Sequence, residues 1–315
     1  MTTPPRQLSP RPFLRRPPVR YDSSILPTVL DYYAAPGCHT DLSGSGIEPG
    51  TVEQVVEMVQ GLLVYDLAAT DLYGVDLSST QAMTVHERNA GSILAAAQRI
   101  DHRPFDVARP PGDRVGGRCH TYALLTVALL RAAGVPARSR CGFGTYFVPD
   151  YYEDHWVAEY WDRSDGRWVM VDPQLDPTWR RMLGLDPEAR VVEVGPEEYV
   201  TAGHAWRAWR AGDLDADRCG LTSIQEHGAF WIAGNLRLDL AALNKVEMLP
   251  WDVWGLHWQP SERPSEATLA VFDAVAALTV DPDAHFDEMR RRYDTDHFRV
   301  DGHVFSVALG EFVEV

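Results

Sequence analysis

Residues 116–123 read Gly-Gly-Arg-Cys-His-Thr-Tyr-Ala, and they open a stretch that is apolar nearly all round as far as residue 133. A pattern without a polar face predicts a buried central helix rather than a surface helix. Gly134 ends this helix, and Pro136 prevents its return. The helix is therefore expected to begin at Cys119, directly after two glycines that allow close approach of the chain or a substrate.

Three runs after this helix have the character of β-strands. Residues 137–143 alternate small or apolar side chains with arginines, and residues 155–161 and 167–172 are rich in Val, Trp and Tyr. The turn-forming sequence between the last two runs predicts an antiparallel hairpin. A loop centred on Ser164 would turn Asp172 to the face opposite His155. We therefore expect a shorter effective loop, or a bulge at Gly166, that brings these two side chains together.

Apolar residues at helical spacing predict further helices on both sides of this segment. They lie at residues 51–65, about 85–100, about 224–243 and 266–278. Two short β-like runs around Asp301 and Gly302 end the chain.

Composition and charge exclude several classes of function. The chain has 45 acidic and 29 basic residues, and its formal net charge of −16 repels the phosphate backbone of nucleic acids. No apolar run approaches the roughly 20 residues that span a bilayer, and residues 1–20 lack the apolar centre of a signal peptide. We expect no nucleic acid, no membrane and a cytoplasmic location. There the four cysteines would stay reduced: Cys38, Cys119, Cys141 and Cys219.

Cys119, His155 and Asp172 supply the three side-chain types that a thiol nucleophile needs. A thiol with the usual pKa of about 8.5 is mostly protonated at neutral pH, and only the thiolate attacks carbonyl carbon well. A helix N-terminus favours the thiolate, and the backbone N–H of Cys119 could help to hold an oxyanion. His155 would act as base and acid, and Asp172 would orient the imidazole.

These residues and their surroundings resemble the transglutaminase-like superfamily. The resemblance covers roughly residues 51–176 and rests on Gly117-Arg118-Cys119 with the Tyr-Ala-Leu-Leu that follows, Gly134 to Arg138, His155-Trp156-Val157, and Trp168 to Pro173. It implies an α+β fold with a papain/transglutaminase-like core, in which the central Cys-bearing helix packs on an antiparallel sheet. It also implies that Cys119 is the nucleophile, His155 the general base and acid, and Asp172 the orienting group.

Three parts of the chain are expected on this basis. Residues 1–20, rich in Pro and Arg, would form a disordered or extended arm. Residues 21–179 would form the transglutaminase-like catalytic core. Residues 180–315 would form a mostly helical C-terminal elaboration that ends in short strands.

The expected function is cysteine-dependent acyl transfer that cleaves or forms an amide or thioester bond through an acyl-enzyme on Cys119. The protein would be a thiol hydrolase or acyltransferase acting on a small-molecule or peptidic acyl substrate, with delivery by a carrier protein left open. No acidic calcium-loop pattern stands out, and we expect no metal and no cofactor. The alternative from another class is a non-catalytic peptide-binding module with the same fold.

Other residues are candidates for a substrate pocket. They are Tyr122, Trp156, Gln225 and Trp254, although core packing is the more typical role of such aromatics. Residues 220–255 are expected to cover one side of the Cys119 cleft. A zinc site built from the Cys-His pairs at residues 38–39 and 119–120 with His155 is a weaker alternative, because the closely paired ligands of structural zinc sites are absent.

Overall fold

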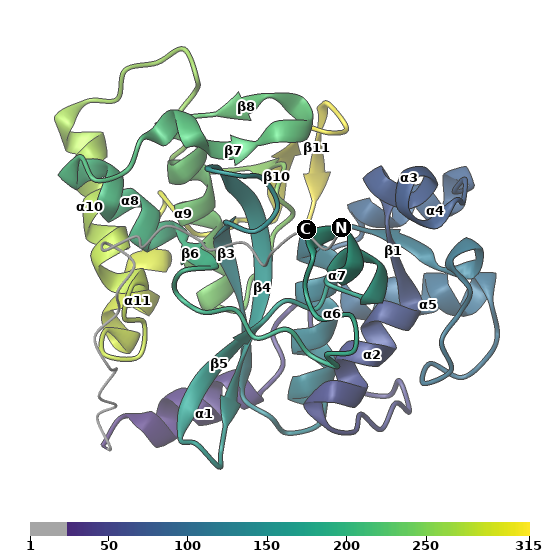
Figure 1. Ribbon diagram of the computed structural model, residues 1–315. Helices are drawn as coiled ribbons and strands as arrows, with labels where there is room; N and C mark the ends of the chain where they lie inside the picture. The colour runs from purple at the N-terminus through teal and green to yellow at the C-terminus, as the bar shows by residue number, and fades with distance from the viewer. Residues whose placement is uncertain (1–23) are drawn as a thin grey trace.

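The computed structural model describes residues 24–315, and the predicted arm at residues 1–20 lies outside them. Figure 1 shows a central sheet with helices on both sides. The helices are α1 (Leu26–Ala34), α2 (Val52–Leu62), α3 (Ala69–Tyr73), α4 (Ser79–Ala82), α5 (Ala90–Ile100), α6 (Cys119–Ala132), α7 (Pro177–Leu183), α8 (Ala202–Ala211), α9 (Ala229–Leu243), α10 (Glu266–Thr279) and α11 (Phe286–Tyr293). The strands are β1 (Leu63–Tyr65), β2 (Val115–Gly117), β3 (Ala137–Gly144), β4 (Tyr152–Asp162), β5 (Arg167–Val171), β6 (Tyr199–Thr201), β7 (Cys219–Leu221), β8 (Glu226–His227), β9 (Asp252–Val253), β10 (His303–Ser306) and β11 (Glu311–Glu314).

The six-stranded central sheet has the order β6-β3-β4-β7-β8, and β5 pairs with the other end of β4. β3 and β4 pair antiparallel along the whole of β3. β5 covers only residues 158–162 of β4, and β7 pairs with β4 at residues 152–153. Strands β6, β7 and β8 of the C-terminal half thus complete the sheet. The prediction of a mostly helical elaboration did not include these strands. They form backbone hydrogen bonds with strand edges that would otherwise lack partners.

The predicted central helix is α6, and its side chains are buried from Cys119 to Arg131. Leu124, Leu125 and Ala128 share one hydrophobic cluster with Ala158 and Val171 of the sheet. In Figure 1, α6 lies beside α2 and α5 on one side of the sheet, and α8 to α11 lie on the other side. The α+β class and the packing of the Cys-bearing helix on an antiparallel sheet are therefore confirmed.

The hairpin of β4 and β5 has the shorter loop that was expected and no bulge. Asp162 pairs with Arg167, and the register continues regularly to Ala158 and Val171. The N–H of Gly166 donates to the carbonyl of Asp162 at 2.8 Å, and Gly166 adopts a φ of 61°, which favours glycine. The alternative of a bulge at Gly166 is not realised, because the four-residue loop alone corrects the face on which the following side chains lie.

Several predicted boundaries differ from the structure for local reasons. The helix expected at residues 51–65 ends at Leu62, because residues 63–65 pair in parallel with β2. The helix expected from about residue 85 begins at Ala90, where the Asn89 side chain accepts from the N–H groups of Gly91 and Ser92.

The C-terminal half departs from prediction in two places. Helix α9 begins at Ala229 instead of residue 224, because residues 219–227 form the short β7–β8 pair. The final hairpin of β10 and β11 turns at residues 307–310 and not at Asp301 and Gly302.

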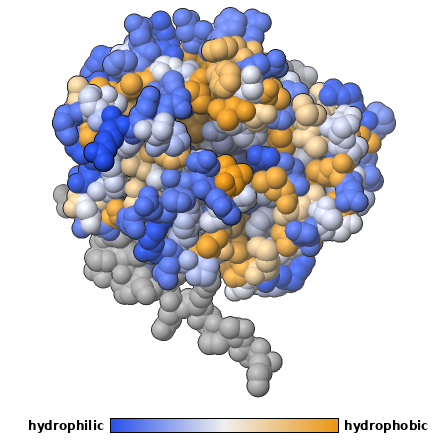
Figure 2. Space-filling model, turned by 90° about the horizontal axis from the view of Figure 1, so that it is seen from above, coloured by the Kyte–Doolittle hydropathy of each residue, from blue (hydrophilic) through white to orange (hydrophobic). Residues whose placement is uncertain are grey.

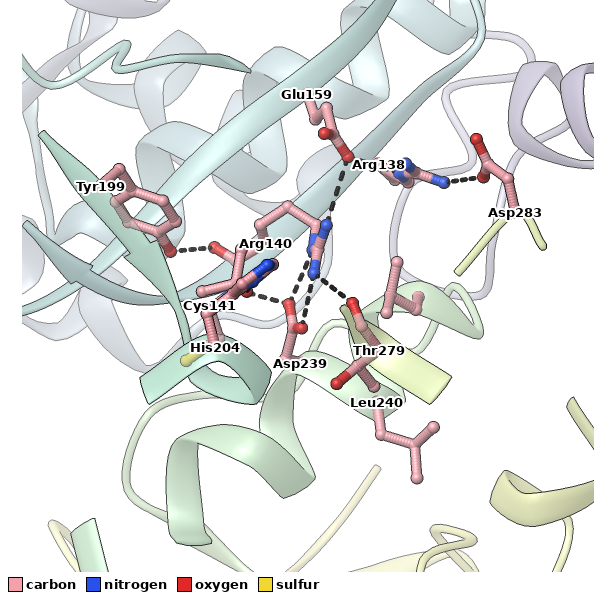
Figure 3. Close-up of polar contacts among 12 residues, drawn as sticks. Arg138, Arg140, Cys141, Glu159, Tyr199, His204, Asp239, Leu240, Thr279 and Asp283 are labelled. Carbon is pink, nitrogen blue, oxygen red and sulfur yellow. Dashed lines mark hydrogen bonds and ion pairs between the residues drawn. The ribbon is translucent and has the colours of Figure 1, made fainter. Parts of the chain in front are cut away.

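A buried network of charged side chains joins the sheet to the C-terminal helices (Figure 3). Arg140 of β3 donates to both carboxylate oxygens of Asp239 in α9 at 2.9 Å, and also to the carbonyl of Thr279. Arg138, two residues earlier, pairs with Glu159 of β4 and with Asp283, both at 2.5 Å. All these side chains are buried, so each charge depends on its partner to offset the loss of hydration.

Lys245 ties the end of α9 to the N-terminal helix. It is the only lysine of the chain. Its Nζ donates to the carbonyls of Tyr32, Pro36 and Ala35 at 3.0, 3.2 and 3.4 Å, and lies 4.0 Å from the centre of the Tyr32 ring. The amine therefore holds the α1 segment against the C-terminal half.

We expect Arg140→Met to lower the free energy of unfolding by roughly 3–5 kcal/mol, because it leaves Asp239 buried without its cationic partner. The matched control is Arg190→Ala, which breaks an exposed pair with Glu57 and should cost less than about 1 kcal/mol. Equilibrium unfolding in urea measures both. Equal losses in the two variants would contradict a structural role for the buried network.

Candidate active site

Cys119 is the first residue of α6, at the helix end where free N–H groups favour negative charge. Its side chain is buried, at 9% exposure. Arg118 precedes it with extended backbone, and the N–H of Arg118 donates to the Thr121 hydroxyl at 3.1 Å. A Cβ at Gly116 would lie 2.8 Å from the carbonyl oxygen of Gln81. The glycine is thus required by close approach of the protein's own backbone.

His155 and Asp172 meet as the hairpin prediction required, although by a different route. Nε2 of His155 lies 2.7 Å from Oδ2 of Asp172. β5 ends at Val171, which pairs with Ala158, so Asp172 follows the last paired residue. If the pairing continued by one residue, Asp172 would lie opposite Val157, and the two side chains would share one face of the sheet. His155 is two residues from Val157 on β4, so its side chain also lies on this face, diagonal to Asp172.

The Asp172 carboxylate is held by two further donors. The Tyr146 hydroxyl donates to Oδ2 at 2.5 Å, and the N–H of Gln174 donates to Oδ1 at 3.0 Å. Burial and the charge of Asp172 raise the pKa of Tyr146 well above its usual value, so the hydroxyl keeps its proton. Sequence reasoning missed Tyr146, which lies in the loop after β3 and carries no spacing signal toward Asp172.

His155 is buried among aromatic rings, and its ring centre lies 4.7 Å from that of Phe147. Burial opposes its charged form, but the charge and hydrogen bond of Asp172, together with the Cys119 side chain that hydrogen-bonds to it, raise its pKa to about 10. Because Nε2 faces Asp172, Nδ1 is the ring nitrogen left for the sulfur. The geometry therefore brings together all three residues that the sequence singled out.

A cavity of about 260 Å³ opens beside His155. Its lining comes from both halves of the chain: Tyr65, Leu67, Phe147, Val148, Glu153, Asp154, His155, Gln174, Trp179, Met182, Leu221, Thr222 and Ser223. Leu67 and Met182 are exposed at its rim, next to exposed Ile224. Figure 2, viewed from above Figure 1, shows hydrophobic side chains gathered around a hollow on this face.

The four predicted pocket residues lie elsewhere than the lining of this cavity. Tyr122 is buried in the core between α6 and α2, and Trp156 and Trp254 are buried in the hydrophobic cluster that also contains Cys119. Gln225 is exposed with a φ of 58°. Of residues 220–255, which were expected to cover one side of the Cys119 cleft, Leu221, Thr222 and Ser223 line this cavity beside His155.

Tyr65 is a site residue that the sequence placed at the end of a helix. Strand β1 pairs it with Gly117, two residues before Cys119, and Trp179 packs edge-on against its ring at 5.5 Å. Among residues 24–315, its hydroxyl has no hydrogen-bond partner. Burial, together with the negative charge of Cys119, raises the pKa of Tyr65, so the hydroxyl stays a donor beside the sulfur.

Within the described residues, no three His, Cys, Asp or Glu side chains are grouped so that they could hold a metal ion, and the zinc alternative gains no support. None of the helices between residues 24 and 315 is long and apolar enough to cross a bilayer.

We expect Asp172→Asn to destabilise the fold in a pH-dependent way. The folded pKa of His155, about 10, lies above its usual 6.5, so the pair stabilises the protein fully below about pH 6.5. That contribution is lost as the pH rises through 10. Urea unfolding should show a deficit of roughly 3 kcal/mol near pH 6 and a much smaller one near pH 10. A deficit that grows with pH would contradict a charged pair.

Comparison with known proteins agrees with this geometry. A family model, the transglutaminase-like superfamily, matches residues 87–173, which contain Cys119, His155 and Asp172. A solved structure named as a cysteine protease from Cytophaga hutchinsonii is 18% identical and covers 55% of this chain and 47% of that chain, with a TM-score of 0.28. At that score the likeness carries no argument.

A curated relative gives a second match. The protein-glutamine gamma-glutamyltransferase of Pseudomonas aeruginosa is 27% identical over 198 residues, which cover 56% of this chain and 26% of the relative. The match thus spans only a part of that larger protein. With the family match, it confirms the predicted resemblance: residues 87–173 are similar to the transglutaminase-like superfamily.

Proposed function

We propose that the protein is a cysteine-dependent acyl-transfer enzyme that cleaves or forms an amide or thioester bond. The observation that carries this proposal is the 2.7 Å contact between His155 and Asp172, beside a cysteine at the N-terminus of a buried helix. A protein that only binds a peptide has no need of an imidazole whose protonation is stabilised next to a thiol. The relative from Pseudomonas aeruginosa, named for glutamyl transfer, supports the same reaction class.

In the proposed mechanism, His155 takes the thiol proton and Cys119 attacks the carbonyl carbon of the donor. The raised pKa of His155 makes its imidazole a strong acceptor for that proton. The imidazolium then protonates the leaving group, and an acyl-enzyme thioester remains on Cys119. His155 next removes a proton from the acceptor, which is water or an amine, and returns it to the sulfur as the product leaves.

Two donors can hold the oxyanion of each tetrahedral intermediate. The backbone N–H of Cys119 is free at the start of α6. The Tyr65 hydroxyl is the side-chain donor, because it lines the cavity beside His155 and has no partner within residues 24–315. Tyr146 acts at a distance from the reacting atoms as a positioning residue for Asp172.

The first test is acylation of Cys119 by p-nitrophenyl acetate, an activated donor that needs no specific recognition. The wild-type protein should release a burst of p-nitrophenol of about one equivalent and gain an acetyl group on Cys119, seen by mass spectrometry of its peptides. Cys119→Ala should lose both signals and keep its fold. Cys219→Ala, which removes a buried cysteine outside the site, is the matched control. An undiminished burst from Cys119→Ala would overturn the proposal.

The second test concerns the oxyanion donor. Tyr65→Phe removes only the hydroxyl, and we expect the rate of acetylation to fall by roughly 10²-fold or more, because the lost interaction is made in the transition state. Tyr73→Phe, which removes a hydroxyl bonded to Asp176, is the control and should acylate normally. Unchanged acetylation in Tyr65→Phe would exclude this hydroxyl while leaving the role of Cys119 intact.

A further inference from the structure

An ion pair joins the two chain segments that carry Cys119 and Tyr65. Arg118 directly precedes Cys119, and Asp66 directly follows Tyr65. Nε of Arg118 donates to Oδ1 of Asp66 at 3.1 Å, and Nη2 donates to Oδ2 at 3.1 Å. A guanidinium that meets a carboxylate through two parallel hydrogen bonds fixes the orientation as well as the distance of the two groups. The pair therefore couples the position of Tyr65 to that of Cys119.

Backbone pairing alone is a weak connection between these two segments. β1 and β2 form a sheet of two strands with three paired residues on each, and Tyr65 and Gly117 are the last of these pairs. A sheet of two short strands is marginally stable by itself. The side chains of Arg118 and Asp66 meet directly beyond its end, so they continue the contact where the strands stop.

The Arg118 guanidinium is also held from the C-terminal half of the chain. Its Cζ lies 4.9 Å from the centre of the Trp251 ring, just before β9. His86 packs edge-on against the same ring at 5.4 Å. The face of an indole ring attracts a cation, so Trp251 favours the orientation of the guanidinium that meets Asp66.

The ion pair is not a requirement for folding. The side chain of Arg118 is 28% exposed and that of Asp66 is 12% exposed. Water can therefore hydrate either group when its partner is removed, and pairs of this kind contribute little to stability. This distinguishes Arg118 from Arg140, whose side chain is 3% exposed. A role of Arg118 in the reaction can thus be measured apart from a role in stability.

We propose that Arg118 is a positioning residue, which holds the Tyr65 hydroxyl, through Asp66, at the place where the oxyanion forms on a carbonyl attacked by Cys119. The inference rests on the reaction and the oxyanion donor proposed above. Stabilisation of an oxyanion depends on the placement of its donors, and a displacement of about 1 Å can cost roughly 10²-fold in rate. Without the pair, the end of β1 is free to move away from Cys119. The hydrogen bond between Cys119 and His155 does not involve the pair.

The experiment compares two reactions of Cys119, acetylation by p-nitrophenyl acetate and alkylation by iodoacetamide, each followed by mass spectrometry of the Cys119 peptide. Acetylation passes through an oxyanion, whereas alkylation displaces iodide from a saturated carbon and forms no oxyanion. Arg118→Ala should acetylate roughly tenfold or more slowly, and be alkylated within about twofold of the wild-type rate. Asp66→Asn, which keeps the positive charge beside Cys119, should show the same selective loss. Equal losses in the two reactions would contradict the proposal, because they would indicate an effect on the thiol itself.

A double-mutant cycle tests whether Arg118 acts through Tyr65. In a Tyr65→Phe background, Arg118→Ala should slow acetylation by less than about twofold, because the hydroxyl that it misplaces is already absent. Single losses that multiply in the double variant would show that Arg118 acts by another route. Normal acetylation by Tyr65→Phe alone would also refute the proposal, since no donor would remain for Arg118 to position.

Arg210→Ala is the matched control. Arg210 of α8 donates to both carboxylate oxygens of Asp273 at 3.0 and 3.2 Å and lies over the Trp209 ring, on the other side of the sheet from α6 (Figure 1). It should keep both rates. A wild-type protein that does not acetylate would overturn the reaction itself, whereas normal acetylation by both the wild type and Arg118→Ala would overturn the role of Arg118 alone. Asp66→Asn decides the matter if Arg118→Ala does not fold.

Discussion

Burial of the central sheet on both faces is the constraint on which the rest of this structure depends. β3 is buried along its whole length, and β4 is buried from Tyr152 to Glu159. A charged side chain on either strand therefore has no access to bulk water and must find a partner within the protein. Arg138 and Arg140 meet carboxylates from the C-terminal half, and His155 meets Asp172.

The same physical rule therefore serves stability at one end of the sheet and the chemistry proposed for Cys119 at the other. The arginine pairs lock α9 and the segment after α10 against β3, and their charges are mutually satisfied. At the other end, Asp172 keeps the imidazole charged next to a sulfur atom, so that the satisfied charge remains available for proton transfer. Glu153 departs from the rule, since one of its oxygens is left without a partner.

The sequence was sufficient to predict the central helix, the hairpin and the three residues of the candidate site. The apolar run after Cys119 and the turn after Asp162 define the helix and the hairpin through local patterns, and the order of Cys119, His155 and Asp172 fixes the site. Asp172 lies past the end of its strand, where register arithmetic alone cannot place it. A loop centred on Ser164 would have put Asp172 on the opposite face, and the shorter loop places it on the face of His155.

The other parts of the fold and of the candidate site depend on contacts between segments that are far apart in the sequence. Tyr65 follows a helix without a break in the apolar pattern, and only its pairing with Gly117 makes it part of a strand beside the cysteine. Arg138 and Arg140 alternate with apolar residues, as they also would on a strand facing solvent, so nothing local shows that both faces are covered. The cavity wall from Leu221 to Ser223 arises in the same way, from a segment whose strands pair with β4 only after folding.

The fixed amine of Lys245 bears on the acyl transfer proposed above, in which an amine is one of the two possible acceptors. With one lysine in the sequence, and with that nitrogen donating to three carbonyl oxygens, a folded copy presents no loose lysine tail to the loaded thioester of its neighbour. The other permanently cationic side chains are arginines, and a guanidinium keeps its proton and does not act as a nucleophile. In the acyl transfer proposed above, the Lys245 amine of one copy is therefore held away from the acyl group carried by another.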